Sequence, residues 1–223
     1  MSTVLHKIET LTKPGDLVQQ VTERDKSFIF KLSPGDVFQT HFGEIQHDNL
    51  IGMIWGYRVK SYLGKVFVLL KPALDDLIRA IPRKTQIMYP KDIGYILVTN
   101  GIGPFTKVNE AGSGSGGLTT ALAFSVGDAG LVISYENNEK YIRIAENNLK
   151  TFGLKNRVIF KLRDISNGFD EKNAQALFLD LQNPDNYISQ ARAALIPGGY
   201  FGCILPTTNQ VSLLITALKK TEL

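Results

Sequence analysis

A glycine-rich turn between a short apolar strand and a helix constrains the fold of this chain most strongly. The run from Val108 to Leu118 reads Val-Asn-Glu-Ala-Gly-Ser-Gly-Ser-Gly-Gly-Leu. It predicts a strand, a tight turn and a new helix. Glycine permits positive φ and lets a ligand approach the backbone, and the free N–H groups that begin a helix attract electron-rich groups. The turn is therefore predicted to be a cofactor loop of the nucleotide-binding kind.

The glycines alone leave two cofactors open. Gly112, Gly114 and Gly117 match the dinucleotide pattern G-x-G-x-x-G, whereas Gly112, Gly114 and Gly116 match G-x-G-x-G, which is typical of S-adenosylmethionine (SAM) methyltransferases. Glu110 precedes the first glycine by two positions and favours SAM, because a carboxylate suits an ammonium group and would repel a pyrophosphate. A flavodoxin-like or NAD-binding fold with an incidental Glu110 is the alternative.

The part of the chain that follows residue 104 alternates strands with helices. Strands are predicted over 107–110, 130–135, 157–162, 175–180 and 200–205, and helices over 117–126, 138–152, 185–195 and 208–220. Strands separated by helices form a parallel, doubly wound sheet. We therefore predict an α/β protein with a doubly wound sheet in the domain over residues 105–223.

The first hundred residues have a different pattern. Short strands over 16–22, 27–32 and 65–70, with a turn at 33–36, predict a small N-terminal β domain over 1–71, either a sandwich or a barrel. Residues 72–104 are predicted to be a basic helical linker, with one helix over 72–81 and another that has Asp92 as its N-cap. His41, His47 and Asp48 invite a metal hypothesis, but hydrogen bonding in turns is the preferred interpretation, so no metal is expected.

The net charge of +4 is concentrated in one stretch. Residues 58–91 carry eight basic and two acidic side chains, a net +6, whereas 1–57 carry −2 and 92–223 are neutral. Such a stretch suits a phosphate backbone, and a solvated surface is the alternative. No apolar run approaches the length of a membrane span, no secretory signal opens the chain, and the single cysteine, Cys203, excludes an internal disulfide. A cytoplasmic location without membrane attachment is expected.

Four acidic residues lie at or just after the ends of successive predicted strands. In such sheets ligands bind beyond the carboxyl ends of the strands. Glu110 is expected to contact the ammonium group of SAM, Glu136 its ribose and Asp164 its adenine amino group. Asp180 is the candidate for chemistry, since a carboxylate beside an adenine amino group would stabilise the positive charge that develops on the ring. A contact between Asp180 and the cofactor amine is the alternative.

Several motifs together resemble one enzyme family. The most specific are Thr40–Gly52 and Gln86–Asp92, and they are joined by the glycine loop, by Ser134-Tyr-Glu136 and by Leu205–Val211. The chain resembles the tRNA (adenine-N1)-methyltransferases that modify the T loop. The resemblance covers nearly the whole chain and implies an N-terminal β domain followed by a Rossmann-like, SAM-binding catalytic domain over 105–223. It also implies a homotetramer that methylates N1 of adenosine 58 of tRNA, with adenosine 57 also open.

The resemblance also implies site residues. Asp180 matches the catalytic aspartate of the family. The expected cofactor-binding residues are Glu110, Gly112, Ser113, Gly114, Ser115, Gly116, Gly117, Leu118, Glu136, Asp164, Ile165 and Asp180. The expected substrate-binding residues are Arg83, Lys84, Gln86 and Tyr89.

The chain departs from the family pattern at two aromatic positions. Asp185 follows Pro184 where the family usually has tryptophan, and Ile204 precedes Leu-Pro where the family often has an aromatic residue. Both changes affect the wall on which an adenine would stack. Family members also continue with further strands after the last helix. A small-molecule or protein methyltransferase and a catalytically inactive tRNA-binding paralogue are therefore the alternative functions.

Overall fold

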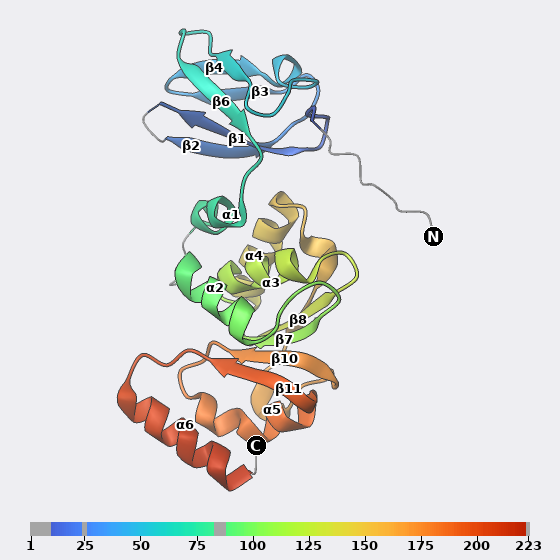
Figure 1. Ribbon diagram of the computed structural model, residues 1–223, viewed down its shortest axis with the longest axis vertical. Coiled ribbons are helices and arrows are strands. Elements are labelled where there is room, and N and C mark those ends of the chain that lie inside the picture. Colours follow the sequence, from blue (N-terminus) through green and yellow to red (C-terminus); the bar gives the residue numbers. More distant parts are fainter. Residues whose placement is uncertain (1–9, 24–25, 83–87, 222–223) are drawn as a thin grey trace. The chain divides into compact units, whose positions relative to one another are not determined.

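The structure is a computed structural model that describes residues 10–23, 26–82 and 88–221 (Figure 1). It divides into two compact units, Met1–Leu77 and Ile78–Leu223. The division falls inside helix α1 (Leu74–Ala80), within the stretch that was predicted to be a linker. Each unit is described by itself below.

The first unit is built from two small antiparallel sheets. Strands β1 (Leu17–Thr22), β2 (Ser27–Lys31), β5 (Arg58–Lys60) and β6 (Val66–Leu70) form a sheet in the order β2-β1-β6-β5, and β3 (Val37–Thr40) pairs with β4 (Gly43–Gln46). Both sheets contribute to one apolar core, in which Phe67 of β6 and Ile45 of β4 are buried. The alternation of the sequence predicted β1, β2 and β6, but it did not identify the other three strands.

His47 and Asp48 serve as acceptors for a turn. The backbone N–H of Ser33 donates to Nδ1 of His47 at 3.1 Å, and that of Gly35 donates to Oδ1 of Asp48 at 3.2 Å. The imidazole of His47 also stacks on Phe30, with ring centroids 4.9 Å apart. Over residues 10–23, 26–82 and 88–221, no group of three or more His, Cys, Asp or Glu residues could hold a metal ion.

Helix α2 (Pro90–Thr99) begins earlier than the sequence predicted. Its N-cap is Tyr89, and Pro90 occupies the first turn, where the fixed φ of proline fits and its missing N–H costs nothing. The expectation that Asp92 is the N-cap was therefore wrong. Asp92 instead lies in the first turn, where its negative charge interacts favourably with the helix dipole.

A five-stranded parallel sheet forms the centre of the second unit. Its strands are β7 (Lys107–Ala111), β8 (Leu131–Glu136), β9 (Val158–Leu162), β10 (Ala174–Leu179) and β11 (Leu195–Cys203). Their order is β11-β10-β7-β8-β9, and every neighbouring pair is parallel. The chain therefore winds outward from β7 in one direction and returns to the other side of β7 with β10. This arrangement confirms the predicted doubly wound α/β fold.

Helices cover both faces of this sheet. Helices α2, α3 (Gly117–Val126) and α4 (Glu139–Thr151) lie on one face, and α5 (Ile188–Ala194) and α6 (Thr208–Thr221) lie on the other (Figure 1). Short 3₁₀ turns η2 (Lys155–Arg157), η3 (Ile165–Asn167) and η4 (Pro184–Tyr187) complete the connections. The predicted helix 185–195 is thus η4 followed by α5. The last strand begins at Leu195 rather than at residue 200, because the Pro-Gly-Gly turn is absorbed into an irregular part of β11.

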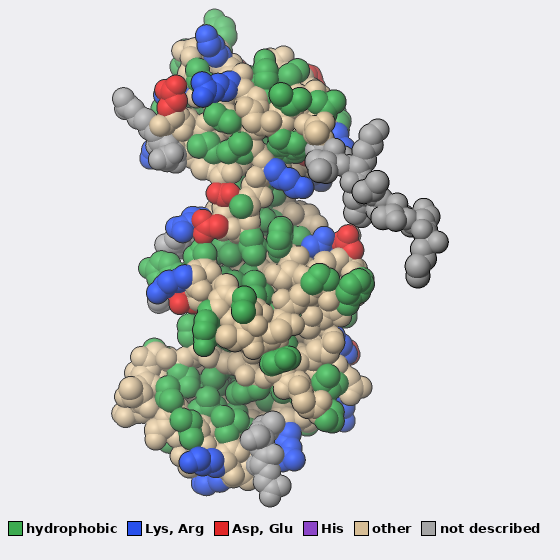
Figure 2. All heavy atoms as spheres, viewed as in Figure 1, with side chains coloured by type: hydrophobic (Ala, Val, Ile, Leu, Met, Phe, Trp, Pro, Cys, Tyr) green, Lys and Arg blue, Asp and Glu red, His purple; other side chains and the backbone are tan. Residues whose placement is uncertain are grey.

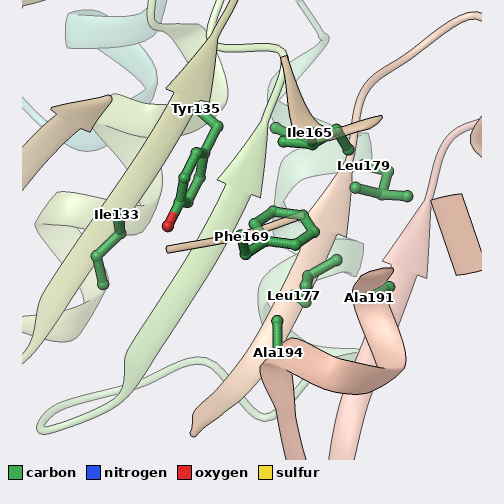
Figure 3. Close-up of a cluster of buried hydrophobic side chains, with 9 residues drawn as sticks. Ile133, Tyr135, Ile165, Phe169, Leu177, Leu179, Ala191 and Ala194 are labelled. Carbon is green, nitrogen blue, oxygen red and sulfur yellow. The ribbon is translucent and has the colours of Figure 1, made fainter. Parts of the chain in front are cut away.

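The face of the sheet covered by α5 packs against a continuous apolar cluster (Figure 3). The ring of Tyr135 from β8 meets that of Phe169 edge to face, with centroids 4.9 Å apart. Leu177 and Leu179 from β10 and Ala191 from α5 belong to the same cluster. This core holds the carboxyl ends of β8 and β10 at fixed positions.

The surface of the second unit is locally apolar near β11 and α6 (Figure 2). Helix α6 buries only Leu214 among its fourteen residues. Val211, Leu213 and Ile215 of this helix are exposed, as is Ile204 after β11. None of the described helices is both long enough and apolar enough to cross a membrane.

Candidate active site

A cavity opens where the winding of the sheet reverses. It has a volume of about 300 Å³ and lies at the carboxyl ends of β7, β8 and β10. The crevice at such a reversal is the usual ligand site of an open α/β sheet. Its lining residues are Met88, Ala111, Gly112, Ser113, Gly114, Ser115, Gly117, Leu118, Tyr135, Glu136, Asn137, Tyr141, Arg163, Asp164, Ile165, Asp180, Leu181, Gln182 and Tyr187.

The glycine loop is fixed by close backbone contacts. Gly112 has a φ of 92°, and a Cβ atom at this position would overlap the backbone oxygen of Asp180. Gly116 is the left-handed N-cap of α3, and a Cβ atom there would come within 3.0 Å of the Cβ of Ala145 in α4. The side-chain amide of Asn148, also in α4, donates to the Ser115 carbonyl at 2.9 Å. These glycines are therefore required for packing as well as for access of a ligand.

Glu136 connects the loop to the end of β8. Its Oε2 accepts from the N–H of Gly114 at 3.2 Å, and its Oε1 accepts from the N–H groups of Asn137 and Asn138 at 3.0 and 3.1 Å. A carboxylate offers about four lone-pair sites, so it retains capacity for hydroxyl donors. This arrangement fits the ribose role expected for Glu136.

Asp164 and Ile165 form another part of the lining. Oδ1 of Asp164 accepts from the N–H of Ser166 at 2.8 Å, which makes Asp164 the N-cap of η3 and lowers the pKa of its carboxyl group. Ile165 is buried in the apolar cluster (Figure 3), and it also belongs to the cavity lining. A carboxylate beside an apolar floor suits a heteroaromatic ring that carries an amino group.

Glu110 does not line the cavity, although the sequence suggested a contact with the ammonium group of the cofactor. It is completely buried behind the loop, and its Oε2 accepts from the hydroxyls of Ser134 at 2.6 Å and Thr119 at 2.7 Å. Its Oε1 has no hydrogen-bond partner in the described part of the chain. Burial raises the pKa of Glu110 to about 7, the two hydroxyls oppose this shift, and the charges of Asp180 and Glu136 add to it.

Asp180 follows β10 and is held by the main chain. Its N–H donates to the carbonyl oxygen of Ala111 in β7 at 2.9 Å. Its side chain lines the cavity, and desolvation raises the pKa of its carboxyl group. Within residues 10–23, 26–82 and 88–221, no side chain or backbone group forms a hydrogen bond or ion pair with this carboxylate. The carboxylate is therefore available to a ligand.

The structure brings ten of the twelve expected cofactor-binding residues to this cavity, and the exceptions are Glu110 and Gly116. Of the expected substrate-binding residues, Tyr89 is exposed and adjoins Met88 of the lining. Arg83, Lys84 and Gln86 lie outside the described residues.

Two tyrosines that line the cavity from outside the sheet were not identified from the sequence. Tyr141 lies in the first turns of α4, and Tyr187 ends η4. Both follow shortly after an acidic residue at a strand end, a signal that could have revealed them. Asp185 and Ile204, which replace the usual aromatic residues, are not part of the lining.

The residues of the cavity fit a SAM-like cofactor. The hydroxyl of Ser113 is buried against the cavity without a hydrogen-bond partner among the described residues, so it can donate to a ligand carboxylate. Glu136, Asp164 and Asp180 offer acceptors to the donors of such a molecule. Gly112 and Gly114 also line the cavity.

Two solved structures that resemble this chain are described as methyltransferases. A crystal structure described as a SAM-dependent O-methyltransferase from Thermotoga maritima is 38% identical, with a TM-score of 0.83 over 96% of this chain and 81% of that one. That of the tRNA (m1A58) methyltransferase TrmI from Aquifex aeolicus is 30% identical, with a TM-score of 0.75 over 94% and 82% of the two chains. The fold and the cavity define a Rossmann-like methyltransferase.

Family models identify the group more narrowly. Residues 65–223 match the model of the tRNA methyltransferase complex GCD14 subunit, and residues 12–58 match the TrmI-like N-terminal model. The chain therefore belongs to the TrmI/GCD14 family of tRNA methyltransferases. It is 33% identical to the tRNA (adenine(58)-N(1))-methyltransferase catalytic subunit TRM61 of Cryptococcus neoformans, matching 92% of this chain and 48% of that protein. The chain thus spans about half the length of this fungal relative.

Proposed function

We propose that this chain transfers a methyl group from SAM to N1 of adenosine 58 in the T loop of tRNA. Family membership supports the reaction class. The observation that carries the proposal is the carboxylate of Asp180, which lines the cavity without a partner in the described structure. Adenosine 57 is a second candidate acceptor.

SAM would supply an electrophilic methyl group on sulfur, and the residues of the cavity would hold the cofactor in place. Glu136 would accept from the ribose hydroxyls, Asp164 from the adenine amino group, and Ile165 would contact the face of the adenine. Ser113 would donate to the cofactor carboxylate. These contacts fix the position of the methyl group, and alignment is the main requirement of a displacement at carbon.

Asp180 would act on the acceptor. SAM would supply its methyl group to the lone pair of N1 of the target adenine and would leave as neutral S-adenosylhomocysteine. The adenine ring would then carry the positive charge. The Asp180 carboxylate would accept a hydrogen bond from the amino group next to N1 and stabilise this charge as it develops. The target base must first leave its stack to reach the cavity.

RNA binding would involve the basic stretch 58–91. Arg58 and Lys60 are exposed on the edge strand β5, and Tyr89 is exposed next to the cavity lining. Arg83, Lys84 and Gln86 are proposed as further contacts on their sequence pattern alone. A tRNA substrate also favours the cytoplasmic location and, by family analogy, a homotetramer.

The proposal is tested by incubating the protein with SAM and unmodified tRNA. Mass spectrometry of the nucleosides should detect 1-methyladenosine, and mapping should place it at position 58, at 57 or at both. A tRNA in which guanosine replaces the adenosines at both positions is the matched control and should receive no methyl group. A second candidate function is methylation of a small molecule or protein, and the likeness to an O-methyltransferase structure is the observation that favours it. Methylation of such a substrate with no methylation of tRNA would support this second function instead. SAM binding without any methyl transfer would indicate a catalytically inactive paralogue.

A further inference from the structure

The carboxyl group of Glu110 lies in an unusual environment just behind the cofactor loop. The side chain has no solvent exposure, and the next residues along the chain, Ala111, Gly112 and Ser113, line the cavity. Two hydroxyls donate to its Oε2, whereas its Oε1 has no partner in the described part of the chain. An ionised carboxylate with one bare oxygen is costly in a buried position. Protonation of Glu110 relieves that cost.

In the described part of the chain, the charges that act on Glu110 are those of two acidic residues. Helix α3 presents only the hydroxyl of Thr119 and contains no ionisable residue, and β8 presents Ser134 and, at its end, Glu136. Asp180 follows the neighbouring strand β10. Both acidic groups are close enough to raise the pKa of Glu110, to about 7 together with burial.

The cationic side chain of Arg163, which lines the cavity, does not compensate the negative charges of Glu136 and Asp180. The guanidinium of Arg163 donates to the carbonyl oxygens of Gly168 and Asn167 and pairs with Asp170 at 2.8 Å. The cavity therefore has an excess of negative charge, which a cationic ligand would reduce. SAM has a net charge of +1, because its sulfonium and ammonium groups outweigh its carboxylate, whereas S-adenosylhomocysteine is neutral overall.

We infer that Glu110 holds a proton in the cofactor-free protein and releases it to solvent when SAM enters the cavity. The inference rests on the proposed use of SAM by this chain. A positive charge in the cavity stabilises the ionised carboxylate of Glu110, so SAM binding and ionisation favour each other. After methyl transfer the sulfonium charge is gone, and Glu110 takes a proton back. The methyl donor thus gains affinity over the product through a residue that need not touch either one.

Calorimetric titration tests this coupling directly. SAM and S-adenosylhomocysteine are titrated into the full chain from about pH 5.5 to about pH 8, in two buffers of different ionisation enthalpy, which together report the protons released. We expect release of up to about one proton with SAM near pH 6 and of fewer with S-adenosylhomocysteine. SAM affinity should rise up to roughly tenfold per pH unit below pH 7 and level off above it.

Variants assign the proton to Glu110. E110Q should release no proton in this range and should lose the pH dependence, and titration of the ligand itself cancels in the comparison with wild type. E139Q is the matched control, because Glu139 is an exposed partner of Arg143 on α4, and it should behave as wild type. S134A removes a hydroxyl donor from Glu110 and should shift proton release to higher pH. Infrared difference spectra of wild type should show loss of a protonated-carboxyl band on addition of SAM, so the test does not depend on the folding of E110Q.

The outcomes separate this inference from the proposed function. SAM binding and tRNA methylation without proton release between pH 5.5 and 7 would overturn the role of Glu110 alone. Equal proton release in wild type and a folded E110Q would do the same. Failure of SAM to bind at any pH would overturn both the proposed cofactor and this inference.

Discussion

Glu110 should make the stability of the second unit, Ile78–Leu223, depend on pH. Its pKa rises from 4.5 to about 7 on folding. Between these values the folded protein holds a proton that the unfolded chain has lost, so the free energy of unfolding falls as pH rises. The contribution of this group is fully present below pH 4.5 and is lost once the pH exceeds about 7. Because each pH unit changes the free energy by about 1.4 kcal/mol, the total loss is up to about 3 kcal/mol.

Urea unfolding of wild type and E110Q from about pH 5 to about pH 8.5 measures this effect. Far-UV circular dichroism follows α3, α4 and α6 and therefore reports on the unit Ile78–Leu223, whereas the single tryptophan, Trp55, lies in the other unit. Wild type should lose stability across neutral pH. E110Q should have a lower stability at pH 5, because its buried amide lacks an acceptor, but it should have a flatter pH profile.

The control and the refuting result both concern the slope of the free energy of unfolding against pH. E139Q removes an exposed carboxylate and should keep the wild-type slope. Parallel pH profiles for wild type and E110Q would refute the conclusion that folding raises the pKa of Glu110. The absolute stability of E110Q does not enter this comparison.

Three further changes test other parts of the molecule. D180N should reduce single-turnover methylation by roughly 10²–10³-fold while SAM affinity changes less, and near-normal turnover would exclude a catalytic role. Charge reversal at Arg83 and Lys84 should weaken tRNA binding and reduce its salt dependence in filter-binding assays, since fewer counterions are released. G112A should lower the free energy of unfolding by more than about 1 kcal/mol and abolish SAM binding, because its Cβ would overlap the backbone of Asp180. G153A has a similar positive φ without any atom near the new Cβ, so its loss should be smaller.

The order of strands and helices in the second unit was predictable from the sequence, because its strands are apolar runs that end at or next to a polar residue. The run Ala176-Leu-Phe-Leu-Asp180 is an example. Its first four residues are buried between the helices on both faces of the sheet and must therefore be apolar, whereas the fifth lines the cavity. The ends of helices were less predictable. Asp92 has the side chain of a good N-cap, yet Pro90 starts the helix two residues earlier because proline fits only its first turn.

The spacing of acidic residues in the sequence did not predict how deeply each acidic side chain of the site is buried. Glu136 ends β8 and Glu110 is the last but one residue of β7, and Glu136 faces the cavity whereas Glu110 points to Ser134 and Thr119 behind the loop. That difference depends on which face of the strand each residue occupies and on the position of α3. The strands β3 and β5 were not identified for a related reason, because three or four residues contain too few alternations to be distinguished from a loop.

Two main-chain contacts have a consequence for how such enzymes change acceptor during evolution. A Cβ atom at Gly112 would overlap the backbone oxygen of Asp180, and the N–H of Asp180 donates to the Ala111 carbonyl. The separation between the glycine loop and Asp180 is therefore set by backbone atoms, which mutation of surrounding side chains leaves in place. Residues such as Tyr141 and Tyr187, which line the cavity, can be replaced to admit another acceptor while the glycine loop and Asp180 keep their spacing.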